Sequence, residues 1–168
     1  KGVHRAERQV CREFGCLMDG KVRKSARASS IDYRNGTFFV TICSLNMSCI
    51  FGSINYNGNV ASVDLSSTGV KVEKVIEFIN SNDDSVKVEN YVVMPNHVHI
   101  LLTVDDIELS DIVRRIKTFT QHDSDKKLWQ RSYFDRKIRD DNEFKNHWIY
   151  IENNPAKWVD DKYYRRKM

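Results

Sequence analysis

The chain has 168 residues, of which 40% are hydrophobic and 11% aromatic, enough for one domain with a core that folds unaided. No apolar run approaches the roughly 18 residues that cross a bilayer, and no signal-peptide pattern follows the basic first residues. The sequence therefore excludes a membrane-spanning helix and predicts a cytosolic protein without a membrane partner. Its net charge is only +4, but the charge is unevenly distributed.

Basic residues are concentrated near the start of the chain. Residues 1–36 carry nine Lys and Arg side chains against four acids, a net charge of +5, so the rest is close to neutral. Such an arm suits a polyanion such as nucleic acid, although a solvated basic leader explains the charge equally well. We therefore divide the chain into a basic arm (1–36), one domain (37–156) and a basic tail (157–168).

The first half of the domain predicts strands followed by a helix. Residues 37–43 are β-branched and aromatic and follow the turn dipeptide Asn35-Gly36, which indicates a strand. Residues 49–54 continue the β character, and Asn57-Gly58 predicts a hairpin toward residues 60–63, together forming a β-meander. Apolar residues at helical spacing then predict an amphipathic helix over residues 68–81.

The second half predicts a strand pair and two more helices. Two β-like runs, 86–94 and 97–104, flank Pro95-Asn96 and suit adjacent antiparallel strands. Apolar spacing from Leu109 to Phe119 predicts a second helix, and a last helix is expected from about residue 140 to 153. These elements predict an α+β fold with helices packed on an antiparallel sheet.

The strand at 97–104 places two imidazoles on one face. Alternate side chains share a face of a strand, so His97 and His99 lie side by side, opposite an apolar stripe that starts at Val98. Two such nitrogens can bind one divalent ion. By itself the pair is weak evidence, and two polar residues on a solvated sheet face would ordinarily be the favoured interpretation.

The last predicted helix offers matching groups. Tyr150 and Asn154 are four residues apart and therefore share a helix face. If this face packs over the two histidines, Asn154 can complete a three-ligand site while Tyr150 stands beside the metal. The alternatives are a tyrosine half buried against the sheet and an asparagine that caps the helix before Pro155.

Three ordered motifs resemble the successive signatures of the REP-associated tyrosine transposases, relatives of the single-tyrosine insertion-sequence transposases. They are YVVMPNHVHILL (91–102), WQRSYFDRKIR (129–139) and YIENNP (150–155), within a resemblance that covers about residues 33–158. The resemblance implies a ferredoxin-like HUH fold. It also implies that His97, His99 and Asn154 bind Mg2+ or Mn2+ and that Tyr150 is the nucleophile.

The same resemblance implies the reaction and its substrate. In this family the tyrosine attacks a DNA phosphate, leaving a 5′-phosphotyrosyl link and a free 3′-hydroxyl that can later reverse the step. The usual substrates are repeated extragenic palindromes, bound as single-stranded hairpins. The family also favours a monomer here, with a homodimer as the alternative. The chain lacks a Walker-type glycine loop, which agrees with strand joining that needs no ATP.

Basic and aromatic residues near these motifs are candidates for DNA binding, because cations follow the phosphate backbone and bases stack on rings. The candidates are Arg114, Arg115, Lys117, Arg131, Tyr133, Arg136, Lys137 and Arg139. For the neighbouring Trp129 and Phe134, core packing is the competing interpretation.

Three alternatives remain open at this stage. Tyr133 is a rival nucleophile, although it lacks a ligand partner at helical spacing. The chain could instead be a hairpin-binding regulator whose catalysis has lapsed. It could also be a metal-dependent hydrolase whose histidines activate water, and such an enzyme would leave no covalent protein–DNA product.

Overall fold

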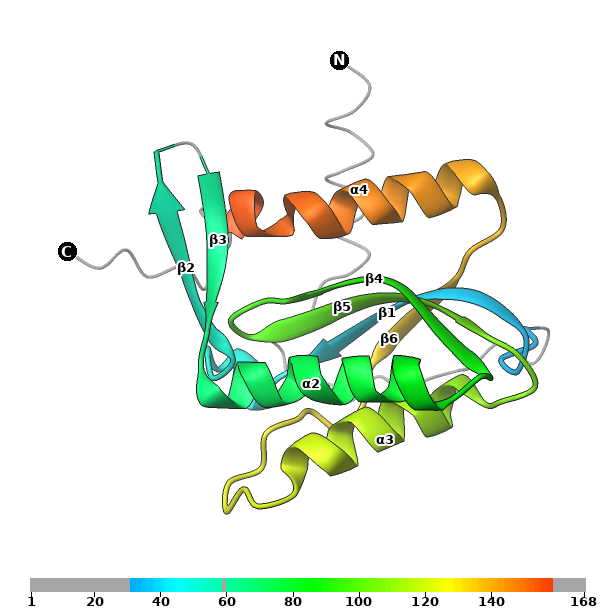
Figure 1. Ribbon diagram of the computed structural model, residues 1–168, viewed down its shortest axis with the longest axis horizontal. Helices are drawn as coiled ribbons and strands as arrows, with labels where there is room; N and C mark the ends of the chain where they lie inside the picture. The colour runs from blue at the N-terminus through cyan, green and yellow to red at the C-terminus, as the bar shows by residue number, and fades with distance from the viewer. Residues whose placement is uncertain (1–30, 59, 159–168) are drawn as a thin grey trace.

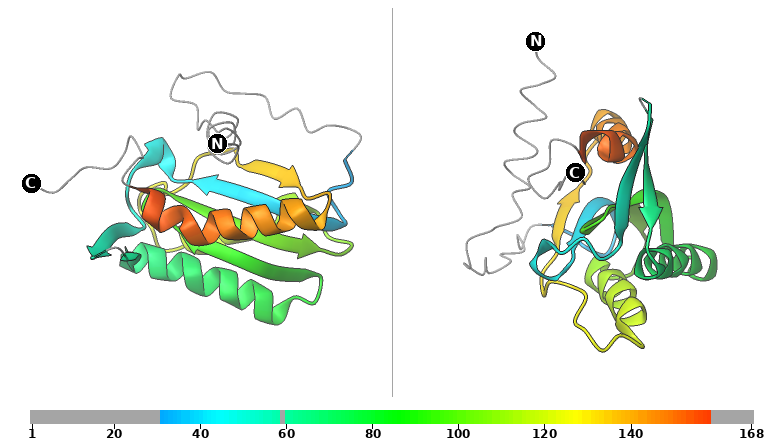
Figure 2. Two further views of the ribbon diagram at one scale, coloured as in Figure 1. Left: turned by 90° about the horizontal axis from the view of Figure 1, so that it is seen from above. Right: turned by 90° about the vertical axis from the view of Figure 1, so that its left-hand side faces the viewer.

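A four-stranded antiparallel sheet lies between helices on both of its faces (Figures 1 and 2). The computed structural model describes residues 31–58 and 60–158. The sheet order is β4 (Val86–Val93), β5 (His97–Val104), β1 (Gly36–Cys43) and β6 (Phe134–Lys137). Helices α2 (Ser67–Asn82) and α3 (Leu109–Gln121) cover one face, and α4 (Asp141–Lys157) lies over the other. The predicted α+β, ferredoxin-like fold is confirmed.

Strand β5 is buried on both faces, which explains its nearly continuous apolar sequence. Val98, Ile100 and Leu102 belong to the large cluster that includes the apolar residues of α2 and α3. Leu101 points the other way and packs with Phe39 of β1 and with α4. The interpretation of the histidine face as solvated is therefore wrong, because α4 covers it.

The predicted β-meander over residues 37–63 is also wrong, because its first strand does not pair with the hairpin that follows it. β2 (Gly52–Asn57) and β3 (Val60–Leu65) form a separate two-stranded sheet, and β1 pairs with β5 and β6 instead. Both edges of β1 are taken by strands distant in sequence, so its hydrogen-bonding groups are satisfied without β2. A short 3-10 turn, η1 (Leu45–Met47), follows β1. The hairpin rises beside the C-terminal end of α4 (Figure 1).

The segment before β2 connects the start of α2 to the turn that precedes β5. Phe51 donates its backbone N–H to Pro95 O at 2.9 Å, and its carbonyl accepts from Ser66 N at 2.9 Å. Ser66 caps α2, since its side chain accepts from Gly69 N at 3.1 Å. A Cβ at Gly69 would lie 2.0 Å from the Phe51 carbonyl oxygen, so only glycine permits this approach. The hydrogen bond from Phe51 to Pro95 thereby fixes the position of the turn before His97.

Helix α4 is longer than predicted and does not stop before Pro155. Its N-cap is Asp140, whose side chain accepts from Glu143 N at 2.8 Å. The helix continues to Lys157, and Trp158 caps it by donating its backbone N–H to the Pro155 carbonyl. The proposed C-cap role of Asn154 is therefore wrong. Pro155 removes only one donor, close to the helix end, and the last turn closes around it.

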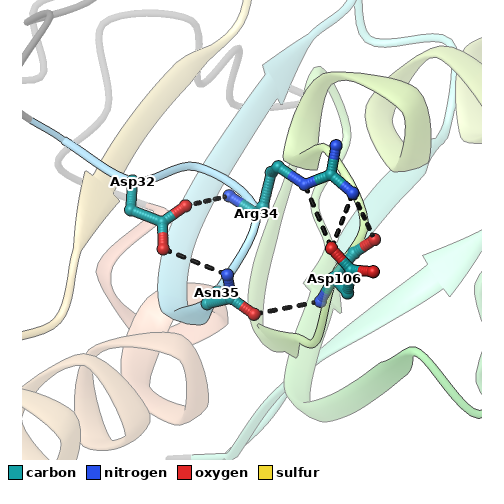
Figure 3. A network of polar contacts seen from close by, with 4 residues as sticks. All are labelled: Asp32, Arg34, Asn35 and Asp106. Carbon is teal, nitrogen blue, oxygen red and sulfur yellow. Dashed lines mark hydrogen bonds and ion pairs between the residues drawn. The ribbon is translucent and has the colours of Figure 1, made fainter.

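The opposite end of the sheet is tied by an exposed polar network (Figure 3). Arg34 pairs with Asp106 at 2.6 Å, and Asp106 N donates to Asn35 Oδ1 at 3.1 Å. Asp32 accepts from Arg34 N and Asn35 Nδ2, and these bonds lower the pKa of its carboxyl group. Residues 31–35 thus contact the domain, although they were assigned to the arm; residues 1–30 and the tail after 158 lie outside the described residues.

No helix within residues 31–58 and 60–158 is both long enough and apolar enough to span a membrane.

Candidate metal and tyrosine site

Two imidazoles converge beneath α4. His97 and His99 are only 8% and 4% exposed, and their Nε2 atoms lie 3.0 Å apart. They are at the start of β5, where β1 and the turn at Pro95 fix the backbone. Asn154 of α4, itself 8% exposed, hydrogen-bonds to His97. The structure therefore brings together the three residues that the sequence singled out as a ligand set.

Tyr150 stands beside the same pair. Its ring centroid lies 5.2 Å from that of His99 and 5.8 Å from that of Phe39, in edge-on contact with both. Tyr150 is one helical turn before Asn154, so both side chains lie on the face of α4 that packs on β5. Residues about fifty positions apart in the sequence thus meet at one place.

The outer nitrogens of both histidines also have partners. Asn96 Oδ1 lies 2.6 Å from His97 Nδ1, and Thr41 Oγ1 lies 2.8 Å from His99 Nδ1. Thr41 is the register partner of His99 across the β1–β5 pairing. Sequence reasoning missed both residues. Asn96 stood inside a recognised motif, but Thr41 could be found only from the strand pairing.

A second group of missed residues surrounds the site with rings. His147 is 7% exposed, and its ring stacks on Phe39 at 4.4 Å. Phe39 also stacks on His99 at 5.1 Å, and Trp158 lies 6.3 Å from His97. His147 precedes Tyr150 by three residues, a helical spacing that could have identified it. These rings restrict the freedom of the imidazoles and keep water away from them.

Burial keeps the two histidines neutral. It lowers the pKa of His97 to about 4, and the hydrogen bond with Asn154 opposes this shift only in part. It also lowers the pKa of His99 well below its ordinary value, and His97 and His147 lower it further. Neutral imidazoles have a nitrogen lone pair to offer, which is the form that binds a metal.

These shifts predict acid sensitivity of the metal-free protein. The unfolded chain takes up protons on His97 and His99 near pH 6.5, whereas folded His97 resists them to about pH 4. The free energy of unfolding is therefore at its full value above pH 6.5 and decreases as the pH falls toward 4. Each of the two histidines contributes a decrease of up to about 1.4 kcal/mol per pH unit. Chemical denaturation between pH 7 and 4 measures this slope.

The matched variant is His97→Gln, which removes one of the two buried imidazoles and should flatten this slope. An identical slope in the wild type and in His97→Gln would contradict the assignment to His97.

The donor set suits a divalent ion. Among the described residues, no cluster of three or more His, Cys, Asp or Glu could hold a metal. Beside the two imidazoles the structure offers the Asn154 amide, which hydrogen-bonds to His97. Mixed nitrogen and oxygen donors fit Mn2+ well and Mg2+ less tightly, because Mg2+ prefers oxygen ligands and an octahedral shell.

The structure separates the rival tyrosine from the histidines. Tyr133 packs against the cluster between the sheet and helices α2 and α3, with Lys117 Nζ 5.8 Å from its ring centroid. The histidines face the other side of the sheet, toward α4. Trp129 is buried in the same cluster and donates to Thr120 Oγ1 at 2.7 Å, so core packing is the correct interpretation for it. Phe134 is 37% exposed.

The basic candidates on α3 do not reach the site. Arg114 is exposed and pairs with Asp111, and Arg115 pairs with Asp83. Lys117 donates to three carbonyl oxygens, those of Gln130, Arg131 and Ser132 at 2.9, 3.3 and 3.0 Å.

The candidates around β6 lie nearer the start of α4. Arg136 pairs with Glu143, and Arg136 and Arg139 line an open pocket beside the first turns of α4. Lys137 donates to Asp32 O at 3.0 Å, while Arg131 is exposed. Arg136 therefore lies on the α4 side of the sheet with Phe39, its register partner, whereas Lys137 lies over the ring of Phe38 on the opposite face.

The contacts of Lys117 predict a structural effect. Burial lowers the pKa of its ammonium group to about 8, so it is still charged at pH 7 and donates to the loop before β6. Lys117→Met should lower the free energy of unfolding by about 1–3 kcal/mol, because the carbonyls lose their donor. Thermal denaturation measures this loss, with the exposed Lys74→Met on α2 as the control. Unchanged stability together with weakened DNA binding would contradict the structural role.

The chain is similar to known proteins. The family described as "Transposase IS200 like" matches residues 66–154, more than half of the chain. An uncharacterized protein of Haemophilus influenzae is 29% identical over 171 residues, which cover 84% of this chain and 93% of that protein. The REP-associated tyrosine transposase of Escherichia coli is 33% identical over 82 residues, and the match spans 46% of this chain and only half the length of that relative.

A solved structure shows the same fold. It is a REP-associated tyrosine transposase bound to a REP hairpin, with a TM-score of 0.59, 23% identity, and coverage of 76% of this chain and 71% of that chain. The resemblance inferred from the three motifs is thereby confirmed. The chain belongs to the IS200-like transposase family.

Proposed function

We propose that this transposase nicks single-stranded DNA and transfers the cut strand through a 5′-phosphotyrosyl intermediate, with the help of a divalent metal ion. The observation that carries the proposal is the placement of the Tyr150 ring 5.2 Å from His99, in a site where His97, His99 and Asn154 meet. A tyrosine beside a mixed nitrogen and oxygen donor set is suited to attack on a phosphate.

We propose that His97, His99 and Asn154 hold Mg2+ or Mn2+. The bound ion would polarise the scissile phosphate and stabilise the charge that develops on its oxygens. The protein supplies two neutral imidazoles for this purpose, because burial disfavours their protonation. Asn154 reaches the site from α4, so the ion would also tie the nucleophile helix to the sheet.

Tyr150 then acts as the nucleophile. A free phenol has a pKa of about 10, so only about one in a thousand is ionised at pH 7, and its attack needs help from the site. The tyrosine oxygen forms a bond to phosphorus, the bond from phosphorus to the 3′ oxygen breaks, and that oxygen takes a proton while the phenol loses one. The new ester keeps the energy of the old one, so the 3′-hydroxyl can reverse the step without ATP.

We propose a single-stranded hairpin of the REP type as the substrate. The REP-associated relative of known structure is bound to such a hairpin. Arg136 and Arg139 line a pocket beside the start of α4, and their cations would bind the phosphate backbone there. We further propose that the chain works as a monomer, because all four site residues come from one chain.

The test is a covalent-capture assay. The full chain is incubated with end-labelled hairpin DNA and Mn2+, and the products are separated under denaturing conditions. A denaturation-resistant protein–DNA adduct that requires the metal supports the proposal. Cleavage without an adduct would favour a hydrolase that activates water, and hairpin binding without cleavage would favour a regulator that has lost its chemistry.

A further inference from the structure

We propose that Asn96 and Thr41 are positioning residues that set the proton positions of His97 and His99 so that both Nε2 atoms can face one metal ion. The inference rests on the proposed function, because it concerns the same metal site. It gives a role to two residues that are not metal ligands. Asn96 lies in the turn before β5, and Thr41 lies on the neighbouring strand β1.

Asn96 is completely buried. Its side-chain oxygen lies 2.6 Å from His97 Nδ1, and an amide oxygen only accepts, so Nδ1 carries the hydrogen. His97 Nε2 is then left with its lone pair. Among the described residues, Asn96 Nδ2 has no hydrogen-bond partner. A buried amide that keeps one unpaired donor is costly, and the contact with His97 is the reason we infer for its presence.

The Nε2 atoms of His97 and His99 are in contact at 3.0 Å. Because His97 Nε2 presents a lone pair, the contact is a hydrogen bond only if His99 Nε2 carries the hydrogen. His99 Nδ1 then accepts from the Thr41 hydroxyl at 2.8 Å. In the metal-free protein these hydrogen bonds therefore run from Thr41 through His99 and His97 to Asn96, and Asn154 adds a further hydrogen bond to His97.

Binding of a metal ion requires a change at His99. An ion held by both Nε2 atoms needs both lone pairs, so the His99 hydrogen must move from Nε2 to Nδ1 by exchange with water. Nδ1 then donates to Thr41, whose hydroxyl can accept as readily as it donates. His99 stays neutral throughout. Thr41 satisfies both states of His99, whereas Asn96 holds His97 in one.

Nitrogen-15 NMR of the histidine rings tests the proton positions directly. In the metal-free full chain, His97 should carry its hydrogen on Nδ1 and His99 on Nε2. Saturation with Mg2+, which is diamagnetic, should move the His99 hydrogen to Nδ1 and leave His97 unchanged. A hydrogen on Nε2 of metal-free His97, or a His99 that binds Mg2+ without this change, would overturn the inference.

Mn2+ titration of matched variants provides the second readout. Thr41→Val and Asn96→Leu should weaken Mn2+ binding about 10–100-fold, as loss of an outer partner of a metal ligand usually does. Thr41→Ser and Asn96→Asp keep a suitable partner and should bind Mn2+ at least about as well as the wild type. If the apolar variants fail to fold, the nitrogen-15 spectra of the wild type still decide the inference.

The matched control is Thr37→Val. Thr37 lies on the same strand and face as Thr41 but bonds to Thr103 at 2.9 Å, away from the histidines, so Mn2+ affinity should not change. Equal affinity of the wild type, Thr41→Val and Asn96→Leu would overturn the inference and leave the metal site standing. Failure of the wild type to bind Mn2+ would overturn the proposed metal site and the inference with it.

Discussion

Tyr150→Phe is expected to abolish the covalent protein–DNA adduct and to reduce cleavage by about 1,000-fold or more, because the attacking oxygen is removed. Hairpin binding and thermal stability should change little. The ring of Tyr150 packs edge-on against His99 and Phe39, and phenylalanine preserves these contacts. Denaturing gels measure the adduct, and a binding titration at fixed salt measures the affinity for the hairpin.

Tyr133→Phe is the matched control for this variant. It removes the same hydroxyl from a tyrosine that packs on the other side of the sheet, beside Lys117. The adduct should persist in Tyr133→Phe. An adduct that survives in Tyr150→Phe but disappears in Tyr133→Phe would reverse the assignment of the nucleophile, and cleavage that continues in Tyr150→Phe without an adduct would favour activated water.

The sequence predicted the helices and the sheet strands well because their signals are local. Residues 68–81 have apolar side chains at helical spacing, and the helix occupies Ser67–Asn82 with Ser66 as its N-cap. The meander failed because the pairing of a strand is decided by distant partners. β1 carries apolar residues on both faces, which indicates a central strand, but nothing in its own residues names β5 and β6 as its neighbours.

The end of the last helix failed for a related reason. A proline after an asparagine ordinarily indicates a helix boundary. Here Trp158 is 5% exposed and caps the helix after Lys157, so the last turn is retained around Pro155. The benefit of burying this tryptophan beside His97 depends on tertiary packing, which no local propensity describes.

In the candidate site too, residues with a regular local spacing could be predicted, and residues brought in by tertiary contacts could not. His97 with His99 and Tyr150 with Asn154 were found as two pairs, because each pair has a regular spacing on one element. The two pairs come together only because α4 lies over β5, an arrangement that the sequence spacing allowed but did not require. The residues that surround the two pairs could not be predicted from the sequence. Thr41 and Phe39 contact His99 only because β1 lies beside β5, and their spacing in the sequence carries no sign of it.

The second large effect is expected at the two histidines. His97→Ala and His99→Leu should each weaken Mn2+ binding by about 100-fold or more and remove metal-dependent cleavage, because one of two converging imidazole donors is lost. The free energy of binding is measured by Mn2+ titration without DNA, so that the loss of metal is seen apart from the loss of cleavage. His99→Leu fills most of the space beneath α4 and guards against simple unfolding.

His147→Phe decides whether this loss reflects ligation or only the packing of rings. His147 is as buried as His97 and stacks on Phe39, but it is on α4 and its ring is not in hydrogen-bond contact with either Nε2 atom in the described structure. Phenylalanine keeps the stack and removes the nitrogens, so Mn2+ binding and adduct formation should persist within a few-fold. If His147→Phe lost the metal as His99→Leu does, the ligand set would have to include His147. Retained binding in His147→Phe and lost binding in His99→Leu would instead limit the imidazole donors to the two on β5.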